Sequence, residues 1–209
     1  MRFLVALLMS AGLARAEGEA AGEFDYYVLA LSWSPTWCAL EGDRRSSPQC
    51  DDEKDNGWVL HGLWPQYEDG WPSFCPTTAR NPSRLATRDE ADLFGSSGNA
   101  WHQWYKHGRC SGLTAEDFYD LAREAYDRVN RPAIFRKLDQ AVRLPAAVVE
   151  QAFLEENPDW QPDQITITCK AGRIQEARLC LTRSLEPRRC GEDVVRDCRA
   201  ADALFEPIR

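Results

Sequence analysis

The sequence is poor in histidine, lacks any Cys-x-x-Cys motif and carries a deficit of positive charge. It has three histidines in 209 residues, and its 25 lysines and arginines face 33 acidic residues, for a formal net charge of −8. That sign argues against a protein that binds nucleic acid tightly and nonspecifically, because such binding depends on neutralising phosphates. Without Cys-x-x-Cys spacing, a zinc site built from the cysteines is also disfavoured. We find no internal repeat or low-complexity linker, so a solenoid is excluded.

Long apolar runs are missing everywhere except at the N-terminus. Residues 1–16 have the features of a secretory signal peptide, with a positive charge at Arg2, an uncharged apolar core and the small-x-small sequence Ala14-Arg15-Ala16. Cleavage there would leave residues 17–209, with a net charge of −10. No other segment approaches the ~20 apolar residues that a membrane-spanning helix needs. We therefore expect one exported domain with no membrane partner, periplasmic or extracellular.

Cysteine, by contrast, is plentiful for a chain of this length. An exported chain with eight cysteines is expected to form disulfides. Spacing suggests that Cys38 pairs with Cys50 and that Cys75 pairs with Cys110, which would tie together two segments far apart in sequence. Eight cysteines allow about 105 connectivities in all, and spacing leaves the pairing among the remaining four open. Those four are Cys169, Cys180, Cys190 and Cys198.

The pattern of apolar residues predicts an α+β fold. Residues 24–33 and 58–63 are expected to be buried strands, the second ended by Pro65, and the polar stretch 38–56 between them a disulfide-bounded loop. A capping-box start at Thr114 predicts a helix that ends near residue 130. Further helices are expected at 134–138 and 145–156, and a β-hairpin at 165–169 and 174–182. We expect a single domain with a central, mostly antiparallel sheet, flanked by helices and stapled by disulfides.

All three histidines fall in two short aromatic motifs. His61 lies in GWVLHGLWP at residues 57–65, and His102 and His107 lie in WHQWYKHGRC at residues 101–110. An isolated histidine usually has no special role, but histidine also has an ordinary pKa of about 6.5 and exchanges protons near neutrality. Three histidines gathered with a lysine and several tryptophans therefore indicate acid–base chemistry.

A helix over residues 101–107 would separate a polar face from an apolar one. At 100° per residue, His102, Lys106, Gln103 and His107 fall within 140° of one another. Trp101, Trp104 and Tyr105 fall outside that arc, and we expect them to pack against the core. Gly108 suits the end of such a helix.

In the first motif, strand alternation predicts that Val59, His61 and Leu63 share one side, with Trp58 and Leu60 on the other. Gly62 has no side chain, so another group is expected to approach closely beside His61. Taken alone, this motif fits a core strand equally well.

These two segments resemble the active-site motifs of the ribonuclease T2 family, secreted acid endoribonucleases whose patterns centre on HGLWP and HEWxKHGxC. The resemblance extends to LALSWSP at residues 29–35, to GWPSFC at residues 70–75 and to the cysteine-rich C-terminal hairpin. It implies an RNA substrate and no cofactor or metal. A net acidic charge is compatible with this activity, because turnover needs only a locally positive site.

The resemblance also implies a role for each residue of the motifs. His61 would be the general acid that protonates the leaving 5′-oxygen, and His107 the general base that takes the 2′-OH proton. His102 and Lys106 would hold the phosphate, whose transition-state charge they would stabilise. Products would be 2′,3′-cyclic phosphates, converted more slowly to 3′-phosphates.

Two positions depart from the family's pattern. Gln103 replaces a glutamate, so a neutral amide stands where the family has a carboxylate near the phosphate; we expect activity to be retained with a shifted pH profile. Gln66 stands where some relatives have an aspartate that reads the base, and we expect low base specificity. Trp64 and Trp71 are the candidates for stacking on the base, which tolerates any base identity.

Two other functions are compatible with the residues. A metalloenzyme would use the histidines as ligands, but His102 and His107 are five residues apart, whereas zinc-binding helices space them by four. A secreted binding module would be either a ribonuclease-like scaffold that has lost catalysis or a tryptophan-rich carbohydrate binder, and Gln103 is its best support. We expect a monomer without an obligate protein partner.

Overall fold

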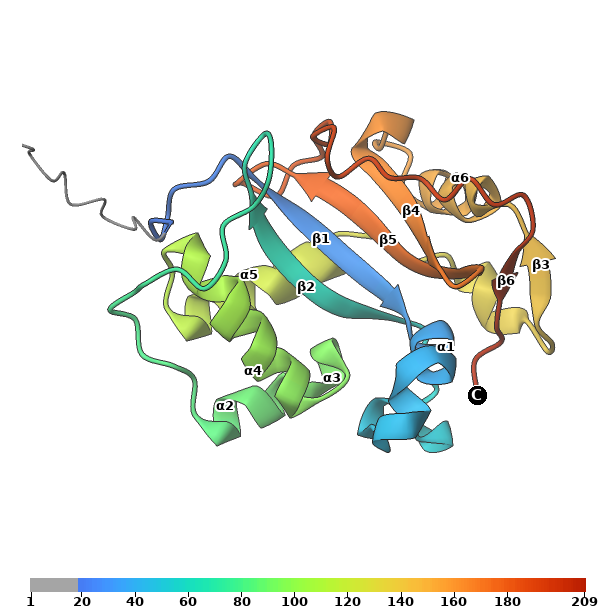
Figure 1. Cartoon of the computed structure of the whole chain (residues 1–209), viewed down its shortest axis with the longest axis horizontal. Coiled ribbons are helices and arrows are strands. Elements are labelled where there is room, and N and C mark those ends of the chain that lie inside the picture. Colours follow the sequence, from blue (N-terminus) through green and yellow to red (C-terminus); the bar gives the residue numbers. More distant parts are fainter. Residues whose placement is uncertain (1–18) are drawn as a thin grey trace, which may run out of the picture.

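A six-stranded sheet organises the molecule, and the computed structural model describes residues 19–209 of the chain (Figure 1). The signal peptide predicted at residues 1–16 lies outside the described residues. The strands are β1 (Tyr26–Trp33), β2 (Trp58–Gln66), β3 (Val142–Leu144), β4 (Ile165–Lys170), β5 (Arg173–Leu181) and β6 (Ala203–Phe205). The helices are α1 (Ser34–Trp37), α2 (Arg84–Asp89), α3 (Ala91–Phe94), α4 (Ser97–Lys106), α5 (Ala115–Asp127) and α6 (Ala146–Glu156). The expected α+β class is confirmed.

Antiparallel pairing dominates the sheet, as expected. The strands run in the order β2-β1-β5-β6-β3, and β4 pairs with β5 as the second strand of the predicted hairpin. Only the short contact between β5 and β6 is parallel. The central strand β1 is buried along its whole length, which explains its almost continuous run of apolar residues.

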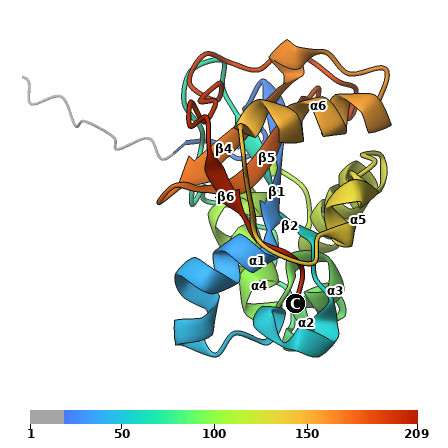
Figure 2. The ribbon, with the colours of Figure 1, turned by 90° about the vertical axis from the view of Figure 1, so that its right-hand side faces the viewer.

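The two faces of the sheet are covered differently. On one face, alternate residues of β1 such as Leu29 and Leu31 join the main core with Phe118 of α5 and Phe153 of α6. Figure 2 shows α5 and α6 on the same side of the sheet. The other face has a small cluster formed by Tyr26, Val28, the Cys180–Cys190 disulfide and Val194. That less covered face carries the candidate site.

Helix starts follow the predicted capping chemistry. The Oγ1 of Thr114 accepts a hydrogen bond from the backbone N–H of Asp117 at 3.2 Å, at the start of α5. Ser96 caps α4 in the same way, through the N–H of Asn99 at 3.1 Å. The helix expected at 134–138 is a 3-10 helix of residues Ala133–Lys137.

Two element predictions were wrong. The 38–56 stretch is not a plain loop but a chain of short helical turns that continue α1, among them Cys38–Gly42 and Asp43–Arg45. Strand β2 does not stop before Pro65 but runs on to Gln66. Proline is tolerated there because β2 is an edge strand that pairs only with β1. The missing N–H therefore removes no hydrogen bond to a strand on its other side.

The structure pairs the eight cysteines into four disulfides. Cys38 pairs with Cys50 and Cys75 with Cys110, as the spacing suggested. The C-terminal four pair as Cys169–Cys198 and Cys180–Cys190. In the described part of the chain, no helix is long and apolar enough to cross a membrane.

Candidate active site

His61 is the extra residue of a β-bulge in β2. Leu31 pairs with Leu60 and Ala30 with Gly62, so His61 has no partner across the ladder. The prediction was right that Val59 and His61 share one side, with Trp58 and Leu60 on the other. It was wrong for Leu63, because the extra residue shifts the alternation and places Leu63 in the main core with Leu60. The side chain of His61 is 43% exposed and faces the open face of the sheet.

The neighbouring strand supplies a carboxylate to this histidine. Oε1 of Glu176 in β5 lies 2.6 Å from Nδ1 of His61. Oε2 of the same carboxylate accepts hydrogen bonds from Nε and Nη2 of Arg178, at 3.0 and 2.9 Å. An ionised carboxylate only accepts hydrogen bonds, so Nδ1 carries the proton and Nε2 of His61 is left for chemistry.

Glu176 is ionised although its side chain is only 3% exposed. Burial opposes the charge, but the hydrogen bond and charge of His61 together with the charge of Arg178 outweigh it and lower the pKa of Glu176 to about 2. A buried carboxylate satisfied on both oxygens holds its partners in fixed positions. Sequence reasoning missed Glu176 and Arg178. The available signal was a pair of opposite charges two residues apart inside a strand, where they share one face.

Helix α4 brings the second motif to the same place. His102, Gln103, Lys106 and His107 all line one pocket with His61. The helix ends at Lys106, and the N–H of His107 still donates to the carbonyl of Gln103 at 3.0 Å. The expected polar face of this helix is therefore the wall of the pocket.

His107 is held neutral by its surroundings. It is 6% exposed, and its Nδ1 has no hydrogen-bond partner among residues 19–209. Burial, followed by the positive charges of Lys106, His61 and His102, lowers the pKa of His107 to about 3. Burial and Lys106 also lower the pKa of His102, which is more exposed. The pocket thus contains a neutral imidazole, able to accept a proton, beside several cations.

Trp64 lies between the two proton-transfer candidates. Its ring stacks on His107 with centroids 5.3 Å apart and meets His61 edge-on at 5.1 Å. Its indole N–H donates to Oε1 of Gln103 at 2.8 Å, which fixes the orientation of that buried amide. A Cβ on Gly62 would collide with both the Trp64 indole and the Gln103 oxygen. The expected close approach beside His61 is thus made by these two side chains.

The pocket has a volume of about 350 Å³ and extends toward the C-terminal loop. Its far wall includes Gln66, which is buried, and Trp71, which is 51% exposed. Asp193 of the C-terminal loop accepts a hydrogen bond from the N–H of Gly70 at 2.9 Å and so holds the residue before Trp71. A second pocket of about 290 Å³ lies beyond His61 and His102 and includes Gln49 and Asn99. His61 and His102 therefore line both pockets.

One sequence expectation for α4 fails. Trp104 is fully buried and contacts the core, as predicted, but Trp101 is 41% exposed. Tyr105 is half-buried and is also outside the core. Instead of packing inward, Trp101 and Tyr105 stack on each other, with ring centroids 4.8 Å apart. Gly108 follows the helix because a Cβ there would meet the rings of Phe118 and Trp104, not because of a left-handed turn.

The donor atoms of the pocket do not form a metal cage. Among the described residues, the one group of potential ligands with all its atoms within 4.8 Å is Cys38, Asp43 and Cys50, and its two cysteines share a disulfide. The pocket histidines are outside that group. A thiolate is the form of cysteine that binds metal, so the oxidised pair offers poor ligands.

Comparison with known proteins finds similarity to ribonucleases. The model of the Ribonuclease T2 family matches residues 24–190. The "Ribonuclease" of Aeromonas hydrophila is 45% identical over 118 residues, which cover 56% of this chain and 52% of that protein. The "Probable ribonuclease" of Haemophilus influenzae is 33% identical over 121 residues, covering 52% and 44%. The chain spans about half the length of these curated relatives.

Solved structures share the fold at lower identity. The "RNase-related protein from Calystegia sepium" aligns with a TM-score of 0.67 and 19% identity, over 88% of this chain and 97% of that one. "RNase NT in complex with 5′-AMP" aligns with a TM-score of 0.63 and 20% identity, over 88% and 98%. These alignments extend the similarity of the fold to nearly the whole of each neighbour.

Proposed function

The chain belongs to the ribonuclease T2 family, and from this premise we propose that it is a metal-independent endoribonuclease that cleaves single-stranded RNA by transphosphorylation. The observation that carries the proposal is the pairing of His61 with Glu176 on the wall of a pocket that also holds a neutral His107. Acid–base catalysis of this reaction needs one group that gives a proton and one that accepts it. The two imidazoles supply those groups from two different elements.

In the first step, His107 accepts the proton of the 2′-OH, and the 2′-oxygen attacks phosphorus. His61, oriented through Nδ1 by Glu176, gives its Nε2 proton to the departing 5′-oxygen. The P–O5′ bond breaks as the P–O2′ bond forms, leaving a 2′,3′-cyclic phosphate. Lys106 and His102 lie beside the reacting phosphate and stabilise its growing negative charge. Water then opens the cyclic phosphate to a 3′-phosphate, with the two histidines in exchanged roles.

Base recognition is proposed for the 350 Å³ pocket. Trp71 presents an exposed ring and Trp64 a partly exposed one, and stacking on such rings tolerates any base. Gln66 places an amide in this pocket, which both donates and accepts hydrogen bonds, whereas a carboxylate would select bases that donate them. We therefore infer low base specificity for the enzyme.

Gln103 is compatible with activity. Its Oε1 is occupied by the Trp64 indole, so the amide is fixed in place and leaves its NH₂ group as the free hydrogen-bonding end. An amide N–H donates to a phosphate oxygen without adding charge. We propose that Gln103 contacts the phosphate in this way.

The proposal also covers location and assembly. Four disulfides suit an oxidising compartment, and residues 17–209 would form the exported catalytic domain after removal of residues 1–16. We propose a monomeric enzyme in the periplasm or outside the cell.

The deciding experiment uses the purified, oxidised protein with EDTA present. An RNA oligonucleotide and its 2′-O-methyl counterpart are incubated from pH 4 to 8, and product ends are identified by mass. Cleavage of the RNA alone, with 2′,3′-cyclic phosphate ends, is the expected result. Binding of both without cleavage would instead assign the chain as a catalytically impaired binding module. Activity lost in EDTA and restored by a metal would point to a metalloenzyme.

A further inference from the structure

Three aromatic side chains form an exposed cluster on the outer side of α4, beside the pocket. The rings of Trp101 and Tyr105 are stacked, with an interplanar angle of 14°, and Phe74 meets Tyr105 edge-on at 5.7 Å. Trp101 is 41% exposed and Phe74 51% exposed. We call Phe74, Trp101 and Tyr105 the aromatic platform. None of the three lies in the buried core or on the wall of either pocket, so neither folding nor the proposed chemistry accounts for them.

The platform is held in place by the chain on both sides. The backbone N–H of Phe74 donates to the carbonyl of Lys106 at 2.8 Å, which fixes the loop to the end of α4. Phe74 adopts a φ of +54°, a left-handed conformation that a phenylalanine rarely takes. The next residue, Cys75, is bonded to Cys110. The surface is therefore preorganised, which lowers the entropy cost of binding a ligand.

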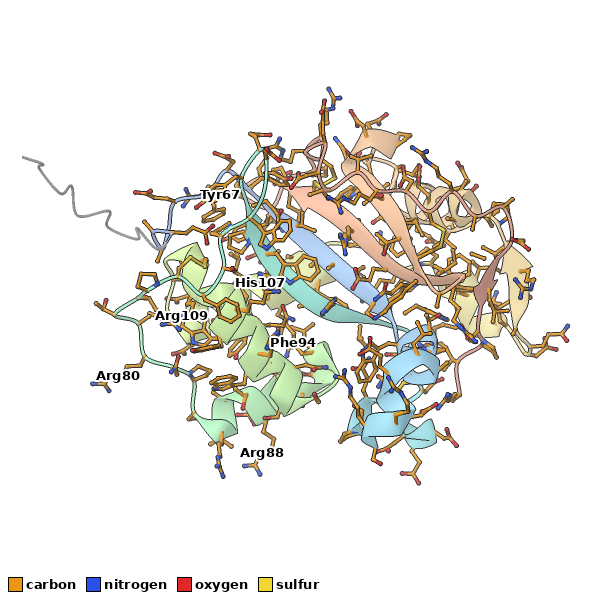
Figure 3. All side chains as sticks on the ribbon, in the orientation of Figure 1. Tyr67, Arg80, Arg88, Phe94, His107 and Arg109 are labelled. Atoms are coloured by element: carbon orange, nitrogen blue, oxygen red, sulfur yellow. A yellow bond between two sulfur atoms is a disulfide. The ribbon has the colours of Figure 1, made fainter. Side chains whose placement is uncertain are left out.

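A cation accompanies the stacked rings. The guanidinium of Arg109 lies over Tyr105, 5.0 Å from the ring centroid. Its Nε is buried without a partner, and its side chain makes no hydrogen bond or ion pair with any residue of the described range. In Figure 3, Arg109 lies beside His107, where the loop after β2 passes the end of α4. Exposed aromatic rings combined with an unpaired arginine are typical of surfaces that bind single-stranded nucleic acid.

The platform adjoins the residues proposed to hold the phosphate. At 100° per residue, Tyr105 lies 60° and Trp101 lies 100° from His102 around α4, so the platform borders the polar face of the helix on the side of His102. The loop that carries Phe74 also carries Trp71, which lines the pocket. A strand of RNA leaving the pocket over α4 would therefore meet stacked rings and a cation without leaving this surface.

We propose that the aromatic platform is an additional subsite for single-stranded RNA, in which one base beyond the two nucleotides at the scissile phosphate stacks on Trp101 and a phosphate further along the strand pairs with Arg109. This inference rests on the proposed ribonuclease function. RNA is favoured over a second protein as the occupant, because the platform borders the helix face that carries His102 and presents an unpaired cation on a protein whose net charge is −8.

The kinetic test compares a two-nucleotide substrate with an eight-nucleotide one, extended on its 5′ or its 3′ side. For Trp101→Ala, the ratio of kcat/KM for the long substrate to that for the short one falls about tenfold, since stacking of one base is lost. Trp101→Phe keeps most of the ratio, and Ile134→Ala, which removes another exposed apolar side chain away from α4, leaves it unchanged. Near-ultraviolet circular dichroism verifies that each variant is folded.

A binding test separates this proposal from the proposed catalysis. Affinity for an uncleavable 2′-O-methyl octanucleotide is measured by fluorescence anisotropy, and Trp101→Ala is expected to weaken it about tenfold. If the parent protein cleaves no RNA but binds the octanucleotide about tenfold more tightly than Trp101→Ala does, the catalytic proposal is overturned and the platform is supported. Equal affinity and an equal substrate ratio in parent and variant would overturn the platform alone. Self-association of the parent that Trp101→Ala abolishes, with RNA binding unchanged, would overturn it in favour of a second copy of the chain.

Discussion

The carboxylate of Glu176 lies 2.6 Å from Nδ1 of His61, although the two residues are 115 positions apart and come from strands separated by β1. The contact is possible because alternation along β2 puts His61, like Val59, on the face that Glu176 occupies, and the bulge leaves His61 without a partner across the ladder. Its carboxylate can accept but not donate, so it selects the tautomer that directs Nε2 to the pocket.

Removing the charge of Glu176 should impair chemistry more than binding. We expect Glu176→Gln to lower kcat about 100-fold with little change in KM, because an amide no longer fixes the tautomer and charge of the general acid. Steady-state kinetics on an RNA oligonucleotide measure this, with Glu186→Gln, an exposed partner of Arg128, as the control. An unchanged kcat in a folded Glu176→Gln protein would show that the pair is only structural.

The pH profile should reveal the neutral His107. Since its pKa is lowered to about 3, protonation of the base should not reduce kcat/KM between pH 7 and pH 4. Gln103→Glu adds a negative charge next to it, which raises the pKa of His107 and moves the acid limb to higher pH. Profiles of the two proteins that superimpose would contradict this role for residue 103.

Stability should also fall with acid because of His107. Between about pH 6.5 and its folded pKa of about 3, the unfolded chain binds a proton at this residue that the folded protein does not. The free energy of unfolding therefore decreases as pH falls through this window, by about 3 kcal/mol from pH 7 to pH 4. Denaturant unfolding at the two pH values measures it, and His107→Gln should show a loss smaller by that amount. A variant as acid-sensitive as the parent would refute the assignment, because Glu176 and other acids contribute equally to both proteins.

The Cys75–Cys110 disulfide should matter for activity beyond its contribution to stability. Its sequence separation is 35, and that of Cys169–Cys198 is 29, so replacing either pair by serines should cost about 4 kcal/mol. Only the Cys75–Cys110 disulfide is close to the candidate site: Cys110 is three residues after His107, and Cys75 anchors the loop that carries Trp71. We expect the Cys75→Ser/Cys110→Ser protein to lose most of its kcat/KM at a temperature where both variants are folded. Equal activity of the two would assign the disulfide a purely stabilising role.

The sequence predicted the long elements better than the contacts between them. Strand β1, helix α5 and the hairpin of β4 and β5 have strong periodicity, and all were predicted correctly because burial alone determines them. The bulge at His61 was not predictable from alternation, since it depends on how β2 is paired with β1. Glu176 was missed for a related reason: only the register of β5 on β1 brings it to His61. Trp101 was wrongly predicted to lie in the core, because the sequence does not show that this face of α4 has no neighbour to cover it.

The position of Trp64 has a consequence for the order of events in the proposed cycle. Indole can only donate a hydrogen bond, and its single N–H is committed to Gln103, so it passes no proton between His61 and His107. After the first step, His107 carries the proton and His61 has lost one. In the proposed cycle, this reversed state is the one that hydrolysis of the cyclic phosphate requires. Trp64 thus holds both imidazoles and the Gln103 amide in position without itself relaying a proton in the proposed cycle.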